Sequence, residues 1–166
     1  MRIRSDLARF GRGFVYAWNG IRAAVKEERN FRFHICAAFY AYAAAWLAGC
    51  TAVELALLSL CVFAVMAMEL MNSAVERAVD KPDTTHWWSA GAAKDMAAGA
   101  VMVTALGAVC VAVCLFGNTA SLRAIWLGVT ASPVRIVLWA ASFVAAYWFT
   151  FRFGRKKEKE ETEHAE

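Results

Sequence analysis

Four stretches without a charged residue limit the folds open to this chain more than any other feature. The three longest have 21, 27 and 16 residues: 33–53, 96–122 and 136–151. The fourth has only 14 residues and lies between Glu54 and Glu69. A transmembrane helix needs about 20 apolar residues, so the fourth stretch spans only if one or both glutamates lie at the bilayer boundary. We predict a membrane protein.

The composition supports this prediction and excludes several other classes. Apolar residues make up 60% of the chain and charged residues 19%, against about 45–50% and about 25% in soluble domains. The five cysteines are odd in number and form no CxxC pair, so we interpret them as small core residues rather than a disulfide framework. No cleavable signal peptide is visible, and we expect the N-terminus to stay in the cytoplasm.

The distribution of lysine and arginine predicts the orientation, because these residues concentrate in cytoplasmic loops. With four spans, sixteen of the 18 basic residues fall on one side of the membrane, and only Arg123 and Arg135 fall elsewhere. Both termini are therefore predicted to be cytoplasmic. This topology and the attraction of anionic headgroups explain the net charge of +4. Nothing in the charge pattern calls for nucleic acid.

The predicted architecture is an all-α membrane protein with an N-terminal amphipathic surface helix. Apolar residues recur every three or four positions among basic ones over residues 7–27, a pattern typical of a helix at the membrane interface. Three core spans follow: 33–50, 52–72 with an extension to 80, and 95–116.

The remainder, residues 117–166, is predicted to form an external segment, a fourth span and a tail. Ser132 and Pro133 have the order of a helix N-cap and first helical position, so the fourth span runs over about 133–151. Residues 119–132 fit either an external loop or a short interfacial helix. Residues 152–166 are predicted to be a charged cytoplasmic tail.

A polar stripe marks the end of the second core span. Glu69, Asn72, Glu76 and Asp80 follow at helical spacing, so they share one face of a helix. A carboxylate at membrane depth costs roughly 2.5–3.5 kcal/mol on insertion scales, which favours a functional role for Glu69. Asp80 alone fits a solvated helix end.

Two other charged clusters are predicted to lie on the same side of the membrane, at residues 27–29 and at Lys94-Asp95. Glu28 and Glu76 could hold a hard divalent cation, Lys94 could neutralise phosphate oxygens, and Glu69 could accept a proton from a hydroxyl. The usual nucleotide-binding loops are absent from the sequence. The residues by themselves therefore predict a membrane site without specifying its reaction.

Two long sequence motifs allow a more specific prediction than the single residues. The segment ELMNSAVERAVD at 69–80 and the segment AKDMAAGAV at 93–101 closely resemble, in order and separation, the signature of the prokaryotic diacylglycerol kinase and undecaprenol kinase family, small integral membrane lipid kinases. Residues 16–24 and 28–34 also look like that family. The resemblance covers roughly residues 7–116, and nothing comparable covers 117–166. Residues 81–88 match the family only loosely.

The resemblance implies a lipid kinase domain over residues 1–116. It implies a homotrimer with shared active sites in the bacterial cytoplasmic (inner) membrane. Such a kinase uses ATP with Mg²⁺ and phosphorylates a lipid hydroxyl at the cytoplasmic face. The additional helix at 133–151 would then brace the trimer, dock a partner or form a passive span.

Site residues follow from the resemblance by matching position. Glu69 is the implied general base, Asn72 a supporting polar group, and Glu28 and Glu76 are the implied metal ligands near the phosphates. The implied ATP contacts are Arg9, Tyr16, Glu28, Glu76, Lys94 and Asp95. The implied lipid contacts, besides Glu69, are Arg22, Ala23, Phe31 and Arg32.

The substrate stays open between two lipids. Tyr16, Trp18 and residues 22–24 favour the diacylglycerol branch, whereas Asn30, His34 and residues 97–101 look more like the undecaprenol branch. We name diacylglycerol first and undecaprenol as the alternative. A small cation-coupled transporter is a more distant alternative, although such proteins tend to place their coupling acid near the bilayer midplane.

Overall fold

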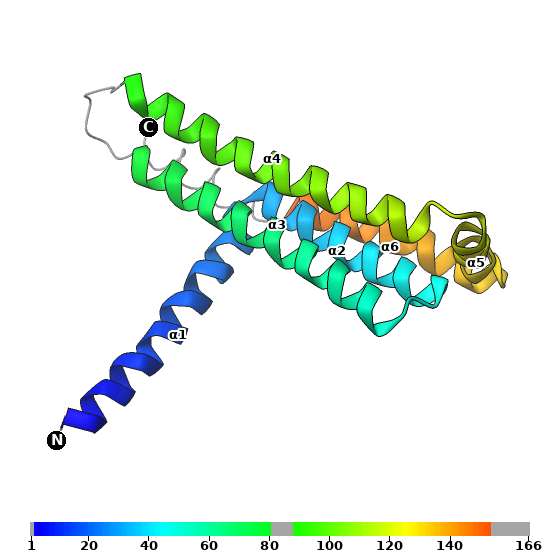
Figure 1. Ribbon diagram of the computed structural model, residues 1–166, viewed down its shortest axis with the longest axis horizontal. Coiled ribbons are helices and arrows are strands. Elements are labelled where there is room, and N and C mark those ends of the chain that lie inside the picture. Colours follow the sequence, from blue (N-terminus) through cyan, green and yellow to red (C-terminus); the bar gives the residue numbers. More distant parts are fainter. Residues whose placement is uncertain (1, 81–87, 154–166) are drawn as a thin grey trace.

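The computed structural model describes residues 2–80 and 88–153, and these form helices with no strand among them. The all-α prediction is confirmed. The helices are α1 (Arg2–Glu27), α2 (Arg29–Ala48), α3 (Ala52–Val79), α4 (Trp88–Phe116), α5 (Thr119–Thr130) and α6 (Pro133–Phe151). Helices α2, α3, α4 and α6 run alongside one another, whereas α1 leaves the bundle at one end (Figure 1). Most of the predicted 81–88 loop and the 152–166 tail lie outside the described residues.

The turn between α2 and α3 explains how the short apolar stretch of α3 is accommodated. Gly49 ends α2 with φ 70°, a left-handed conformation that glycine adopts without strain. Thr51 then caps α3, and the Glu54 carboxylate accepts hydrogen bonds from the Thr51 backbone N–H and hydroxyl, both at 2.7 Å. Glu54 is therefore used in a capping box at the helix end, at one extremity of the bundle.

Three helices are long and apolar enough to cross a membrane: α3, residues 90–116 of α4, and α6. Helix α2 has 20 residues and packs among them, but Arg32 and His34 lower the hydropathy of its first turns, and its crossing remains a prediction. Little of the spanning helices is buried within one chain, and none of the most apolar part of α4 is. Such a surface needs lipid or another protein against it.

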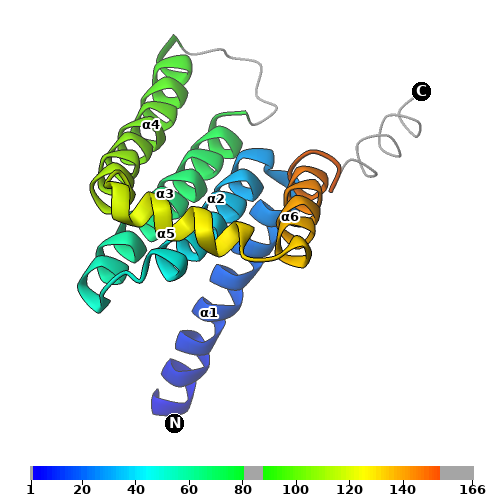
Figure 2. The same cartoon turned by 90° about the vertical axis from the view of Figure 1, so that its right-hand side faces the viewer.

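The segment after α4 is helical. Asn118 caps α5 by accepting a hydrogen bond from the Ser121 backbone N–H at 2.8 Å. Figure 2 shows α5 crossing the end of the bundle from α4 to α6. A Cβ atom at Gly128 would lie 2.5 Å from Leu47 Cδ2, so α5 packs closely on α2, and a larger residue at this position would displace the Leu47 side chain. Of the two alternatives, a loop or a short helix, the structure adopts the helix.

Helix α6 begins at Pro133 behind the Ser132 cap, as predicted, and returns along α2. The Tyr40 hydroxyl lies 3.2 Å from Ser142 Oγ, and the Tyr40 ring stacks on Phe143 with centroids 4.7 Å apart. Near the end of α6, the Arg32 guanidinium donates to the Thr150 carbonyl at 3.3 Å. The extension is thus packed against the rest of the chain.

The ion pairs that join helices in the described part of the chain lie at one end of the bundle. Arg77, near the end of α3, bonds to Glu28 at the α1–α2 junction, and Lys94, near the start of α4, bonds to Asp80. The end of α6 lies at the same level because Thr150 meets Arg32. This arrangement agrees with the predicted topology, in which the α1–α2 junction and the end of α6 share one side.

Candidate active site

Helix α3 supplies the buried polar side chains of the site. Glu69 is 3% exposed, Asn72 is 7% exposed and Ser73 is 6% exposed. The Ser73 hydroxyl donates to the Glu69 backbone carbonyl at 3.0 Å, which leaves the Glu69 carboxylate for other partners. Asn30, at the start of α2, interacts with that carboxylate. A buried acid in an apolar helix, facing a second helix, is the central feature of this site.

The two polar atoms of the Asn72 side-chain amide differ in their hydrogen bonding. Its Nδ2 atom donates to Glu76 Oε1 at 2.9 Å. Its Oδ1 atom is buried and has no hydrogen-bond partner among the residues that the structure describes. An acceptor left in this state costs about 1–3 kcal/mol. The open oxygen therefore marks a position where a hydroxyl, a water molecule or a cation would be stabilised.

Glu28 reaches the same region from the junction of α1 and α2. Its Oε1 atom accepts from Arg77 Nη2 at 2.8 Å, and the same nitrogen lies 3.0 Å from Glu27 Oε2. Glu28 and Glu76 both act electrostatically on Glu69. The fold thus brings together the carboxylates that the sequence placed in separate segments.

The oxygen atoms of this cluster suit a magnesium ion. Mg²⁺ prefers oxygen ligands and usually takes one or two carboxylates together with substrate phosphates. The described residues contain no group of three His, Cys, Asp or Glu side chains that could hold a metal ion by themselves. Glu28, Glu76 and the open Asn72 Oδ1 would therefore be candidate ligands only in combination with the substrate. The remaining ligands would come from phosphate oxygens and water.

Lys94 stands at the edge of the site, near the start of α4. Its Nζ atom lies 2.9 Å from both carboxylate oxygens of Asp80. The ion pair joins the end of α3 to α4 and fixes the lysine stem. Asp80 fits the solvated helix end that the sequence suggested, and the neighbouring Asp95 is exposed.

A single chain does not bring the α1 residues to this cluster. Arg9 and Tyr16 lie on the part of α1 that leaves the bundle (Figure 1), and Tyr16 is 69% exposed. The positions matched to lipid contacts are divided. Arg22 is exposed on α1, whereas Phe31 and Arg32 are buried where α1 meets α2.

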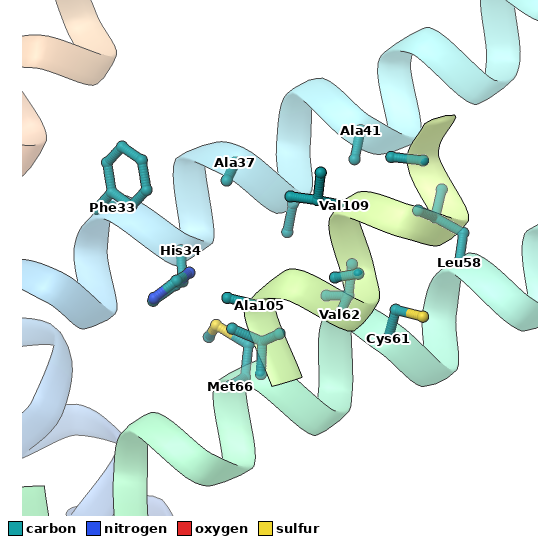
Figure 3. A pocket seen from close by; sticks show the side chains of 14 residues that line it. Phe33, His34, Ala37, Ala41, Leu58, Cys61, Val62, Met66, Ala105 and Val109 are labelled. Atoms are coloured by element: carbon teal, nitrogen blue, oxygen red, sulfur yellow. The ribbon is translucent and has the colours of Figure 1, made fainter. Parts of the chain in front are cut away.

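An apolar cavity of about 340 Å³ lies between α2, α3 and α4. Figure 3 shows His34 and Ala37 of α2, Met66 of α3 and Ala105 of α4 around it. Met66 is three residues before Glu69, so the cavity begins about one helical turn from the buried acid. A hydrocarbon chain would be stabilised in such a space.

Comparison with known proteins decides the family. Residues 15–116 match the prokaryotic diacylglycerol kinase family. The chain belongs to this family. It is therefore a membrane lipid kinase, and the kinase family implies ATP as the phosphoryl donor. The family match ends at Phe116, which is also the last residue of α4, so α5 and α6 lie beyond it.

Curated relatives include kinases for two lipids. The undecaprenol kinase of Bacillus subtilis is 39% identical over 103 residues, which cover 62% of this chain and 84% of the relative. The diacylglycerol kinase of Synechocystis is 41% identical over 103 residues, covering 61% of this chain and 59% of the relative. The diacylglycerol kinase of Escherichia coli K12 is 36% identical over 94 residues, covering 57% and 77%.

Sequence reasoning about this kinase missed several residues of the site. Arg77 holds Glu28, Ser73 bonds to the Glu69 carbonyl, and Asn30 faces Glu69. Arg77 and Ser73 lie within the family motif, and their helical spacing from Glu69 was the available signal. The partner of Asn30 becomes visible only when α2 is packed on α3.

Proposed function

We propose that this chain phosphorylates the hydroxyl of a membrane lipid, with diacylglycerol as the first candidate and undecaprenol as the alternative. The observation that carries the proposal is the buried Glu69 carboxylate, which lies beside two further carboxylates and one turn from an apolar cavity. This arrangement suits a substrate that has a hydrocarbon chain and a reactive hydroxyl. Family membership favours the kinase over the transporter that the sequence also allowed.

Glu69 is the proposed general base. The lipid hydroxyl oxygen attacks the γ-phosphorus of ATP, the bond from that phosphorus to the β,γ-bridging oxygen breaks, and the hydroxyl proton passes to Glu69. ADP leaves with the bridging oxygen, and the product is the lipid phosphomonoester. Asn72 supports the step by accepting a hydrogen bond through Oδ1 and by holding Glu76 through Nδ2.

The charged groups around Glu69 are the proposed nucleotide site. Glu28 and Glu76 would hold Mg²⁺, which when bound neutralises charge on the phosphate oxygens. Arg77 keeps Glu28 turned toward α3, and Lys94 is kept near the same end of the bundle by Asp80. Lys94 would contact the phosphates, with Asp95 beside it.

We further propose a homotrimer with shared sites, in which α1 of one chain brings Arg9 and Tyr16 to the carboxylates of another. The exposed position of Tyr16 and the unburied surface of α4 support this proposal. Residues 1–116 would form the kinase domain in the cytoplasmic membrane, with the site at the cytoplasmic face. Arg22, Ala23, Phe31 and Arg32 would border the lipid entrance.

The test is an assay of the purified protein with radiolabelled ATP and each lipid offered separately in the same detergent. We expect lipid-dependent transfer of label to diacylglycerol, with slower transfer to undecaprenol. The reverse preference would assign the chain to the undecaprenol branch. ATP consumption that is independent of both lipids would contradict the proposed function.

A further inference from the structure

One buried arginine joins the ends of two helices that are far apart in the sequence. Arg32 is 5% exposed. Its Nη1 atom donates to the carbonyls of Val25 and Lys26 at 3.1 and 2.9 Å, and its Nε atom donates to the carbonyl of Thr150 at 3.3 Å. The first two carbonyls belong to the last turn of α1, and the third belongs to the last turn of α6.

The chemistry of these contacts makes the arrangement stable. The last carbonyls of a helix have no intrahelical partner and carry the negative end of the helix dipole. A guanidinium presents several donors in a rigid planar fork, so one side chain can satisfy both helix ends. Close by, the Arg29 guanidinium carbon lies 5.9 Å from the centroid of the Phe151 ring, which adds a second contact between the end of α6 and the start of α2.

The position of Thr150 is set by the contact of α6 with α2. Cys36 Sγ lies 3.9 Å from the Ala146 carbonyl oxygen and 3.6 Å from Thr150 Oγ1. Farther along the helices, Tyr40 contacts Ser142 and Phe143. These contacts extend over about two turns of each helix and bring the Thr150 carbonyl to Arg32.

Helix α1 depends on the same junction. Its residues 9–22 are exposed, whereas Ala24 is 3% exposed, and the helix leaves the bundle from that point (Figure 1). The direction of α1 is therefore set by the few residues between Ala24 and Arg32. Arg9 and Tyr16 lie on the part of this helix that is outside the bundle (Figure 1), and Glu28 lies within the junction.

We propose that α6 is a brace for the surface helix α1, and that Arg32 is the positioning residue through which it acts. By holding the α1–α2 junction, α6 orients the nucleotide-binding residues of α1 and Glu28. This inference rests on the proposed kinase function for its effect on ATP. Its structural part, the stiffening of the junction by α6, can be tested without any activity.

The first experiment moves α6 away from α2 in the full-length protein. In Ala146→Trp, the indole needs space where α6 approaches Cys36, because Ala146 is half-buried one turn before Thr150. The matched control is Ala145→Trp, which places the same side chain at an exposed position of the same helix. Both variants are compared with wild type in lipid nanodiscs.

Amide hydrogen exchange gives the structural result. We expect the amide exchange rates of residues 21–32 to rise about fivefold or more in Ala146→Trp, which is the effect of losing about one hydrogen bond. In Ala145→Trp these rates should stay unchanged. Residues 52–60, at the other end of the bundle, serve as an internal reference. Unchanged exchange at 21–32 in a folded Ala146→Trp protein would overturn the proposal.

Kinetics give the functional result. We expect the KM for ATP to rise about fivefold in Ala146→Trp, with little change in the KM for lipid. The rise in the KM for ATP should be larger in Arg32→Gln, and Arg32→Lys should restore part of it, because lysine keeps the charge without the fork. The KM for lipid is compared only in the α6 variants, because Arg32 also borders the proposed lipid entrance. Equal loss in the lysine and glutamine variants, with exchange unaltered, would contradict a positioning role for Arg32.

A second variant keeps the proposal testable if Ala146→Trp does not fold. In Thr150→Cys, the new thiol faces Cys36 and oxidation should link the two helices. The amide exchange rate of residues 21–32 should then fall below the wild-type rate, and reduction of the disulfide should restore the faster rate. No fall in the cross-linked protein would overturn the brace. Absence of kinase activity in wild type would contradict the proposed function, whereas the exchange results would still decide the structural part.

Discussion

Helices α3 and α6 are both apolar enough to cross a membrane, yet they use their polar groups in opposite ways. In α3, Glu69 and Asn72 are buried, and Asn72 Oδ1 has no partner in the described part of the chain. In α6, Ser142 and the Thr150 carbonyl are paired with side chains of α2. Unsatisfied polarity in an apolar helix indicates a ligand site, whereas satisfied polarity indicates a packing contact.

The largest expected effect comes from α3. Glu69→Gln keeps the size of the side chain but removes the proposed base, so kcat should fall by about 10²–10⁴ while ATP binding and assembly persist. The control is Thr104→Val, which removes only a hydroxyl that donates to backbone carbonyls of its own helix, outside the site. Activity of Glu69→Gln above about a tenth of wild type at saturating lipid would contradict the role of base.

Substitution of the proposed metal ligands should give the next largest effect. Glu76→Gln and Glu28→Gln should each weaken magnesium-dependent ATP binding by about tenfold, because a neutral amide is a weaker ligand for a hard cation than a carboxylate. Titration of ATP binding with and without Mg²⁺ measures this. Glu54→Gln, a change in the capping box at the other end of α3, is the control. An unaltered magnesium response in both variants would place the metal ligands elsewhere.

A packing change at α5 tests the extension without touching the site. Relative to Gly107→Ala, Gly128→Ala should be less stable by about 1 kcal/mol, because the added methyl group would displace the Leu47 side chain, whereas both variants gain the helix propensity of alanine. Gly107→Ala adds the same group where nothing lies within 4 Å. Equal melting temperatures for the two variants would mean that α5 is not packed against α2 as described.

The smallest expected effect is the loss of one hydrogen bond between α2 and α6. Tyr40→Phe removes the hydroxyl that meets Ser142 and keeps the ring that stacks on Phe143. A loss of about 0.6 kcal/mol is expected, the average for such bonds in a membrane protein, with turnover at saturating substrates unchanged. Tyr147→Phe, at an exposed position of α6, is the control. A fall in turnover would mean that this contact also affects the site.

The sequence predicted the parts of this molecule that depend on local pattern. The bounds of α3 and α6, the Ser132 cap and the stripe from Glu69 to Asp80 follow from periodicity and capping residues. The structure extends α1 and α4 toward the N-terminus of each predicted helix, to Arg2 and Trp88, because polar residues are compatible with a helix outside the bilayer. The 1–116 domain and the residue roles remain predictions.

The parts that could not be predicted depend on which helices pack together. The partners of Arg32 are backbone carbonyls, which every residue possesses, so no side-chain pattern marks them. The cavity beside Met66 arises from alanines of α2 and α4 that face each other across a gap, and small residues alone do not show which helix they face. Arg9 and Tyr16 lie on the part of α1 outside the bundle (Figure 1), and their approach to the carboxylates of another chain belongs to the proposed homotrimer.

The cluster of Glu28, Glu69 and Glu76 also bears on what happens after phosphoryl transfer. A lipid phosphomonoester is dianionic or nearly so at neutral pH, and like charges repel strongly where water is scarce. With no Mg²⁺ bound, Glu28 and Glu76 would repel the phosphate of a bound product, and they would not repel a neutral lipid substrate. In the proposed mechanism, this repulsion would favour release of the phosphorylated lipid into the bilayer and would limit inhibition of the enzyme by its own product.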